Sequence, residues 1–277
     1  MTSAELIDIE IKLLMEGVYQ VYGYDFREYA DASLRRRLIQ WLSGSGFATL
    51  SLAQSEVLRD PVLFDTLLRG ITVNVSEMFR DPAFFKTVRV QVVPHLKTYP
   101  FLKIWHAGCS TGEEAYSMAI LLLEEGLKGR FRIYATDINE DVIRKARKGI
   151  YPLQEIKRFT KNYQHSGGTG SFSDYYTARY DHAILNPSLQ ENIVFAAHNL
   201  AVDSDFGEMN LILCRNVMIY FKQPLKERVL GLFDSSLVLG GFICLGTKES
   251  LDHRLIANRY EEIKPRTQIY RKRYARL

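Results

Sequence analysis

A turn that contains two glycines, within residues 104–114, has the pattern of a ligand-binding loop. Residues 104–107 predict a strand, Gly108 and Gly112 lie in the turn, and an acidic pair opens a helix. Glycine lets backbone approach a ligand closely, and the first N–H groups of a helix are free to bind one. The turn could therefore hold a nucleoside or amino-acid moiety, although a purely structural strand-to-helix turn has the same pattern.

Two acidic residues indicate what such a ligand would be. Asp137 ends the next predicted strand, where an acid can accept hydrogen bonds from both ribose hydroxyls; it could instead cap the helix that begins near Asn139. Glu113 stands at the helix start beside Glu114, and this pair would repel a pyrophosphate. A carboxylate there suits an amino group or a sulfonium-bearing cofactor, which argues against NAD.

The N-terminal segment 4–68 is predicted to be helical throughout. Its apolar residues recur at spacings of three and four, and the pattern breaks at Gly23, at residues 43–46 and at Asp60-Pro61. Aspartate can cap a helix and proline can occupy its first turn. We therefore expect a small domain of about four helices.

A linker follows these helices. Residues 71–80 lose the helical period and read as extended chain. Asp81 and Pro82 then repeat the pattern of a capping residue followed by proline, so a capped helix is expected to begin there.

Beyond residue 100 the sequence alternates between strands and helices. Such alternation predicts a mostly parallel sheet with crossover helices. The predicted strands are 102–107, 131–136, 193–197, 210–213 and 242–245, the predicted helices are 113–125, 140–148 and 224–239, and a terminal strand pair is expected near 260–263 and 268–271.

The alternation is suspended between residues 151 and 192. This stretch contains a glycine-rich run at residues 165–171, followed by aromatic, hairpin-like sequence around Tyr175, Tyr176 and Tyr180. We expect a small inserted subdomain with a mobile glycine-rich tip.

Four stretches, residues 72–81, 108–114, 135–139 and 213–221, keep an order and spacing that can be compared with known families. Together they resemble the chemotaxis receptor glutamate methyltransferases, the CheR-type enzymes. The helical start and the terminal strand pair extend this resemblance to nearly the whole chain.

Three positions depart from the family pattern. Ser76 stands where threonine is common, and it keeps the hydroxyl. Ala115 stands where proline often follows the two glutamates. His106 stands where serine is common, and its imidazole could be a buried neutral spacer or could alter the pocket.

The resemblance implies a fold and a division into domains. The fold would be α/β, a class I (Rossmann-like) methyltransferase with a mixed, mainly parallel sheet. A helical N-terminal domain is expected at residues 1–70 and a linker that contributes to the cofactor site at 71–81. The methyltransferase domain would span 82–277, with the inserted β-subdomain at about 151–192.

The resemblance also implies an activity and a cofactor. Such an enzyme transfers a methyl group from S-adenosylmethionine to glutamate side-chain carboxylates of methyl-accepting chemotaxis receptors, which is a step of signal transduction. The products would be glutamate methyl esters and S-adenosylhomocysteine, and no metal is expected. The implied cofactor contacts are Asn74, Ser76, Arg80, Gly108, Glu113, Asp137, Asn199, Leu200, Arg215 and Asn216.

The chemistry of this reaction needs alignment more than acid or base. A glutamate side chain, with a pKa of about 4.3, is already ionised at neutral pH, so its attack on an activated methyl group needs no general base. An arginine or a tyrosine could orient the attacking carboxylate. The candidates are Tyr220, Arg80 and Arg215, with Tyr220 preferred; Arg80 could instead only clamp the cofactor, and Tyr220 could only wall the pocket.

The expected partner is the cytoplasmic domain of a methyl-accepting receptor. Arg35, Arg36 and Arg37 lie on the second predicted helix, and the resemblance suggests that this helix faces the receptor's acidic methylation region. A solvated helix face is the alternative explanation. We expect the enzyme to act as a monomer.

Composition favours a soluble, cytoplasmic protein. The first ten residues have no basic and apolar pattern of an export signal, and the longest apolar run, residues 118–123, is too short to insert into a bilayer. The net charge of +4, from 36 basic and 32 acidic residues, is too mild to indicate nucleic-acid binding. Three cysteines without metal-ligand spacing are expected to be reduced thiols.

Two other functions share parts of this pattern. A methyltransferase acting on the amino groups of nucleic-acid bases commonly has Asn or Asp, two prolines and an aromatic residue after the fourth strand, whereas residues 214–217 read Cys-Arg-Asn-Val. A degenerate methyltransferase that serves as an adaptor would be expected to have lost Glu113, Asp137 or Arg80, and the sequence retains all three.

Overall fold

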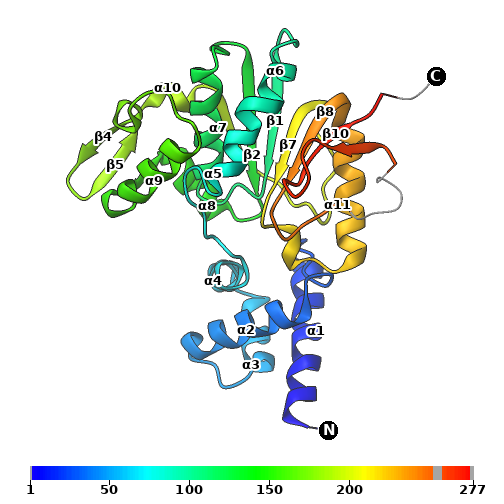
Figure 1. The fold of residues 1–277 in the computed structure, drawn as a ribbon. Coiled ribbons are helices and arrows are strands. Elements are labelled where there is room, and N and C mark those ends of the chain that lie inside the picture. Colours follow the sequence, from blue (N-terminus) through cyan, green and yellow to red (C-terminus); the bar gives the residue numbers. More distant parts are fainter. Residues whose placement is uncertain (1, 252–257, 275–277) are drawn as a thin grey trace. The chain divides into compact units, whose positions relative to one another are not determined.

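The computed structural model describes residues 2–251 and 258–274, and the chain forms two compact units (Figure 1). The first unit comprises Met1–Val73, Asn199–Ser204 and Met218–Val229. The second comprises Asn74–His198, Asp205–Val217 and Leu230–Leu277. Nowhere in the described part of the chain is a helix long and apolar enough to cross a membrane.

The N-terminal part of the first unit is helical, as predicted. Within residues 2–73 four helices are described: α1 (Ser3–Tyr22), α2 (Asp31–Ser45), α3 (Leu50–Val57) and α4 (Pro61–Ile71). Gly23 ends α1 in the left-handed region with a φ of 75°. The Asp60 carboxylate accepts a hydrogen bond from the Val62 N–H at 2.8 Å, with Pro61 in the first turn of α4. The expected breaks are therefore confirmed at these sites.

The second unit is built on a mixed, mainly parallel sheet, which confirms the expected architecture. Among the described residues seven strands have the order β6-β2-β1-β7-β8-β10-β9; the first five run parallel, and β10 and β9 are antiparallel to their neighbours. The strands are β1 (Leu102–Ala107), β2 (Phe131–Asp137), β6 (Ile193–Ala197), β7 (Met209–Cys214), β8 (Leu237–Leu245), β9 (Tyr260–Glu262) and β10 (Ile269–Lys272).

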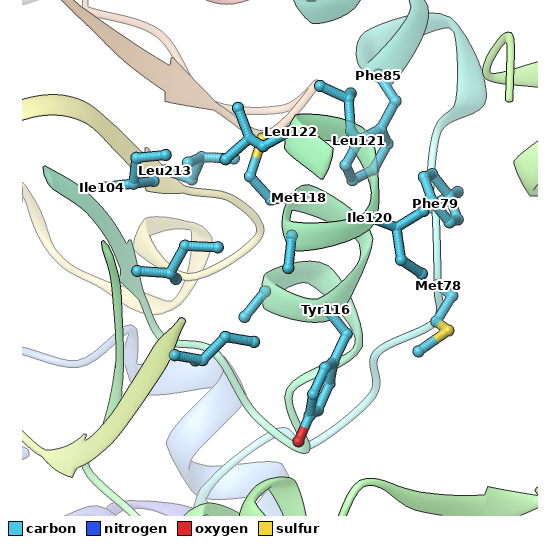
Figure 2. Close-up of a cluster of buried hydrophobic side chains, with 14 of the residues drawn as sticks. Met78, Phe79, Phe85, Ile104, Tyr116, Met118, Ile120, Leu121, Leu122 and Leu213 are labelled. Atoms are coloured by element: carbon cyan, nitrogen blue, oxygen red, sulfur yellow. The ribbon is translucent and has the colours of Figure 1, made fainter. Parts of the chain in front are cut away.

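Alternate residues of β1 pack on opposite faces of this sheet. Ile104 belongs to the large buried cluster around helix α7 (Glu113–Glu124), which Figure 2 shows with apolar side chains on several sides of the helix. Trp105 points the other way, and its ring centroid lies 5.1 Å from that of Phe233. A helix that is apolar nearly all round is suited to burial, and α7 is the buried centre of its face.

The other helices of the second unit cover the sheet or connect its strands. They are α5 (Pro82–Thr87), the π-helical turn η1 (Val88–Val92), α6 (Val93–Leu96), α8 (Glu140–Lys148) and α10 (Pro187–Gln190). Helix α11 (Gln223–Ser236) ends three residues earlier than the predicted 224–239. The apolar run after Ser236 fits either period, and pairing with β7 draws Leu237 into strand β8.

The expected cap at Asp81 is absent, which corrects the sequence analysis. Asp81 precedes α5 but makes no capping hydrogen bond, and its φ of 58° lies in the left-handed region. Its carboxylate instead pairs with the guanidinium of Arg215 at 2.6 Å. The linker itself is irregular and ends in a turn at residues 78–81, so only its first part is free of turns.

A second, three-stranded sheet occupies much of residues 150–185. Its order is β3-β5-β4, with β3 (Ile150–Pro152), β4 (Tyr176–Arg179) and β5 (His182–Leu185), and the 13-residue helix α9 (Leu153–His165), which we did not predict, precedes the turn η2 (Phe172–Tyr175). The hairpin of β4 and β5 turns at residues 180–181, so the glycine-rich run is not its tip. That run lies between α9 and η2, where the Thr169 N–H contacts the Glu124 carboxylate at 3.3 Å.

The turn after β1 has a tight contact that requires glycine. Gly108 has a φ of 77°, and a Cβ atom there would lie 2.4 Å from a methyl carbon of Val217. Gly129 has a similar φ of 73°, but nothing lies within 4 Å of its added Cβ. Both positions therefore need a left-handed backbone, but only Gly108 also lacks room for a side chain.

We predict that Gly108→Ala destabilises the protein more than Gly129→Ala. Both substitutions should cost about 1–2 kcal/mol for the left-handed backbone, and the contact with Val217 should add about 1–3 kcal/mol at Gly108 only. Denaturant unfolding of the two variants measures this difference. Equal losses of stability would show that the Val217 contact relaxes without cost.

Candidate cofactor-binding site

The predicted site residues of the second unit gather at one edge of the large sheet. Strands β1, β2 and β7 are parallel, so their carboxyl ends meet at the same edge, and the strand order reverses between β1 and β7. Ligands of open α/β sheets bind outside the carboxyl ends of the strands at such a switch point. Gly108, Asp137 and Arg215 directly follow or end these strands.

Asp137 connects the turns after β1 and β2. One carboxylate oxygen accepts a hydrogen bond from the Ser110 N–H at 2.9 Å, and the other accepts one from the Asn139 N–H at 3.0 Å. Helix α8 is capped by Asn139 and not by Asp137, because the Asn139 side chain accepts from the Asp141 N–H at 2.9 Å. Burial raises the pKa of the Asp137 carboxyl above its usual range.

Ser110 lies in the same turn and has two unusual features. Its φ of 52° is in the left-handed region, and its buried hydroxyl has no hydrogen-bond partner among the residues that the structure describes. A buried hydroxyl without a partner costs free energy, so a ligand that supplies one would be favoured here.

Glu113 is a buried carboxylate at the first position of α7. Both of its carboxylate oxygens lie within 2.8 Å of the Thr111 hydroxyl, and the Ser76 side chain also hydrogen-bonds to it. Burial nevertheless raises the pKa of Glu113 above its usual range. Within the described residues no lysine, arginine or histidine forms an ion pair with Glu113. The hydrogen bonds and the charge of Arg158 act to lower this pKa, but burial outweighs them.

The pKa of the neighbouring Glu114 is shifted in the opposite direction. Its carboxylate contacts Nδ1 of His106 at 3.2 Å and Nη1 of Arg215 at 2.9 Å. Burial acts to raise its pKa, but the hydrogen bond from His106 and the charge of Arg215 prevail and lower the pKa of Glu114 to about 2. His106 is buried, and its Nδ1 lies on the same Glu114 carboxylate that Arg215 contacts.

The linker is attached to the first turn of α7. The Phe79 N–H donates a hydrogen bond to the Ser117 hydroxyl at 2.9 Å, and that hydroxyl donates to the Glu113 carbonyl at 2.7 Å. Met78 and Phe79 are fully buried, and Figure 2 shows both beside Ile120 of α7. These contacts bring Ser76 to Glu113, as the predicted site requires.

The turn after β7 depends on a residue that the sequence analysis missed. The buried Glu249 carboxylate accepts hydrogen bonds from the N–H groups of Asn216 at 2.9 Å, Val217 at 3.0 Å and Gly246 at 2.6 Å. Asn216 has a φ of 62°, which such a fixed turn can hold. A lone acid after the strand β8 follows no recognisable spacing, so only the tertiary structure identifies it.

Other predicted site residues lie in the first unit or make weaker contacts. Asn199 stabilises its own loop, because its side-chain oxygen accepts from the Ala201 N–H at 3.0 Å, and Leu200 beside it is buried. The Tyr220 carbonyl accepts a hydrogen bond from the Ala30 N–H at 2.8 Å within the first unit. In the second unit, Nη1 of Arg80 lies 3.4 Å from the Val75 carbonyl oxygen, and Asn74 is the first residue.

Comparison with known families decides what this site is. Residues 74–267 match the family model described as "CheR methyltransferase, SAM binding domain", and residues 9–72 match the "CheR methyltransferase, all-alpha domain". The chain belongs to the CheR methyltransferase family. The family, the enzyme class and the S-adenosylmethionine cofactor expected from the sequence are thereby confirmed, as is the class I methyltransferase fold.

Individual relatives agree with this membership. The chain is 50% identical over 272 residues to "Putative methyltransferase Cher3" of Pseudomonas putida, which covers 98% of this chain and 100% of that protein. It is 28% identical over 231 residues to the "Chemotaxis protein methyltransferase" of Listeria monocytogenes, covering 83% and 85% of the two chains. The protein of the same name from Escherichia coli is 27% identical over 259 residues, covering 90% and 86%.

The sheet edge fits the cofactor of this family. S-adenosylmethionine carries an amino group and ribose hydroxyls. The edge presents the buried carboxylates of Glu113 and Asp137, and a Ser110 hydroxyl without a hydrogen-bond partner among the described residues. A positive group beside Glu113 would restore the ionised state that burial disfavours.

Glu113 should therefore cost stability in the protein without cofactor. A carboxyl whose pKa is raised by folding destabilises the folded state once pH exceeds its unfolded pKa, and the full penalty applies above the folded pKa. We predict that Glu113→Gln stabilises the cofactor-free protein at neutral pH, on the order of 1 kcal/mol, the usual size for a stabilising substitution. Thermal unfolding across pH should show the gain fading in acid, where Glu113 is protonated in both states.

Proposed function

We propose that this CheR-family methyltransferase transfers the methyl group of S-adenosylmethionine to glutamate side-chain carboxylates of methyl-accepting chemotaxis receptors. The observation that carries the proposal is the packing of the two histidines His106 and His198 in the described structure. His106 is buried with Nδ1 on Glu114, and the His198 ring packs against Trp105 at 5.2 Å. A site whose histidines are packed in this way suits an acceptor that is already ionised and needs no base.

Bound S-adenosylmethionine supplies an activated methyl group on a sulfonium. The residues of the chain then have to position the reactants and exclude water, with the attacking oxygen roughly 3–3.5 Å from the methyl carbon. Glu113 would hold the amino group, aided by Ser76, and Asp137 would accept from the ribose hydroxyls. The other proposed cofactor contacts are Asn74, Arg80, Gly108, Asn199, Leu200, Arg215 and Asn216.

For the acceptor carboxylate we propose Tyr220 and Arg80 as orienting residues. Arg215, the third candidate from the sequence, already has both terminal nitrogens on protein carboxylates. We also propose the domain division of residues 1–70, 71–81 and 82–277, with the helical domain facing the receptor.

Methyl transfer to a receptor fragment tests this function directly. With S-adenosylmethionine labelled in the methyl group, the enzyme should label the cytoplasmic fragment of a receptor from the same cell, and mild base should release the label as methanol, because carboxyl methyl esters hydrolyse readily. Replacing the labelled glutamates by glutamine should abolish labelling. Base-stable label, or no label with an enzyme that binds S-adenosylhomocysteine, would refute the glutamate assignment.

The contacts of α2 single out one arginine for receptor binding. Arg35 pairs with Asp8, and Nη1 of Arg37 lies 3.4 Å from the Thr72 carbonyl oxygen. Arg36 between them is exposed. We therefore propose Arg36 as the residue of this run that is most available to an acidic receptor surface.

We predict that Arg36→Glu slows receptor methylation severalfold at low salt while leaving the affinity for S-adenosylhomocysteine unchanged. The defect should shrink as salt screens exposed charges, since the Debye length falls from about 30 Å at 0.01 M to about 8 Å at 0.15 M. Lys12→Glu, an exposed lysine on α1 with the same charge change, is the control. Equal rates for the Arg36 variant and the parent would show that this helix face is solvated and does not contact the receptor.

A further inference from the structure

We infer that Arg215 is a positioning residue, which fastens the end of the linker to the first turn of α7 and so holds Ser76 beside Glu113 and fixes the turn that carries Arg80. Its guanidinium would then act through other residues and would not touch the acceptor carboxylate. The inference rests on the cofactor residues proposed above, but it does not depend on which group accepts the methyl.

Arg215 joins three segments that are distant in sequence. Nη1 lies 2.9 Å from the Glu114 carboxylate, 101 residues away, and Nη2 lies 2.6 Å from the Asp81 carboxylate, 134 residues away. The guanidinium carbon also lies 3.9 Å from the centre of the Phe84 ring. Strand β7, helix α7 and the linker with α5 therefore meet at one side chain.

The surroundings of Arg215 leave its guanidinium little room to bind an acceptor carboxylate as well. Its side chain is 1% exposed, and both terminal nitrogens are engaged by carboxylates of the protein. Arginine orients a carboxylate best through a two-nitrogen fork, and here the fork is already filled. The buried Nε has no partner among the described residues, and a single N–H cannot provide that fork.

The linker needs such an attachment because its final turn is strained. Phe79 and Asp81 have φ angles of 52° and 58°, a region that costs a residue with a side chain about 1–2 kcal/mol. The Phe79 N–H is held by Ser117, and the Asp81 carboxylate is held by Arg215. Unusual backbone of this kind persists only where the surroundings hold it in place. Loss of the Asp81 contact should therefore loosen the segment that carries Arg80 and Ser76.

The two carboxylates that contact Arg215 differ in how strongly they depend on it. Glu114 is half-buried and its pKa is lowered to about 2, so it stays ionised beside Arg215 and His106. Asp81 is 40% exposed, so it can lose its partner without leaving a buried charge. Removing the Asp81 carboxylate thus tests the linker contact, while the Glu114 contact keeps Arg215 in place.

The test compares Asp81→Asn, Arg215→Lys and the double variant by calorimetry with S-adenosylhomocysteine. We expect each single variant to bind roughly tenfold more weakly, the order seen when an outer partner of a metal-binding site is removed, and the double variant to bind no more weakly than Arg215→Lys alone. Hydrogen exchange of linker amides 75–81, measured without ligand, should be faster in all three.

Glu77→Gln is the matched control, because Glu77 is a second linker carboxylate that pairs with the exposed Arg158 at 2.9 Å. It should alter neither affinity nor exchange at residues 79–81. If Arg215→Lys does not fold, Asp81→Asn alone decides, since its side chain is partly exposed. Unchanged affinity or unchanged linker exchange in Asp81→Asn overturns the inference. Neither readout uses a receptor, so a failure here is distinct from a failure of the proposed function.

Discussion

Two neighbouring carboxyl groups at the start of α7 have pKa values shifted in opposite directions, and the rest of the site is arranged around this difference. Both are removed from water, which disfavours their charge. Glu114 receives compensation from Arg215 and His106, and its pKa is lowered to about 2. Glu113 receives hydrogen bonds from hydroxyls and the influence of Arg158, but burial outweighs them and raises its pKa. One acid is thus satisfied within the protein, while its neighbour is left to be satisfied by a ligand.

The sheet makes this arrangement possible by bringing distant segments to one edge. Parallel pairing sets His106 of β1 beside Leu213 of β7, so the residues that follow both strands lie near the start of α7. Side-chain alternation turns His106 toward the face of the sheet that α7 covers, where it meets Glu114. The linker is then attached twice, through Phe79 to Ser117 and through Asp81 to Arg215. The site is therefore a consequence of strand order as much as of its motifs.

Sequence patterns predicted the regular elements well and the polar contacts poorly. The bounds of β1, α8 and β6 agree with prediction residue for residue, because each has clear periodicity and a turn signal at its ends. The cap at Asp81 was wrong, since a buried arginine far along the chain competes for that carboxylate. Glu249 had no local signal at all, because its three N–H donors come together only in the folded sheet. Pairings across a hundred residues cannot be read from local spacing.

His106 shows how a departure from the family pattern can be absorbed. A serine, which the resemblance leads one to expect here, has a shorter side chain than the imidazole, whose Nδ1 lies 3.2 Å from the Glu114 carboxylate. The carboxylate would then depend more heavily on Arg215, and the desolvated space around it would need other packing. In this chain Glu114 has two partners. His106 contacts one carboxylate oxygen, which helps to hold the other oxygen in its ion pair with Arg215. A histidine at this position therefore affects the Glu114–Arg215 pair that holds the linker. We do not assign it a part in the chemistry of methyl transfer.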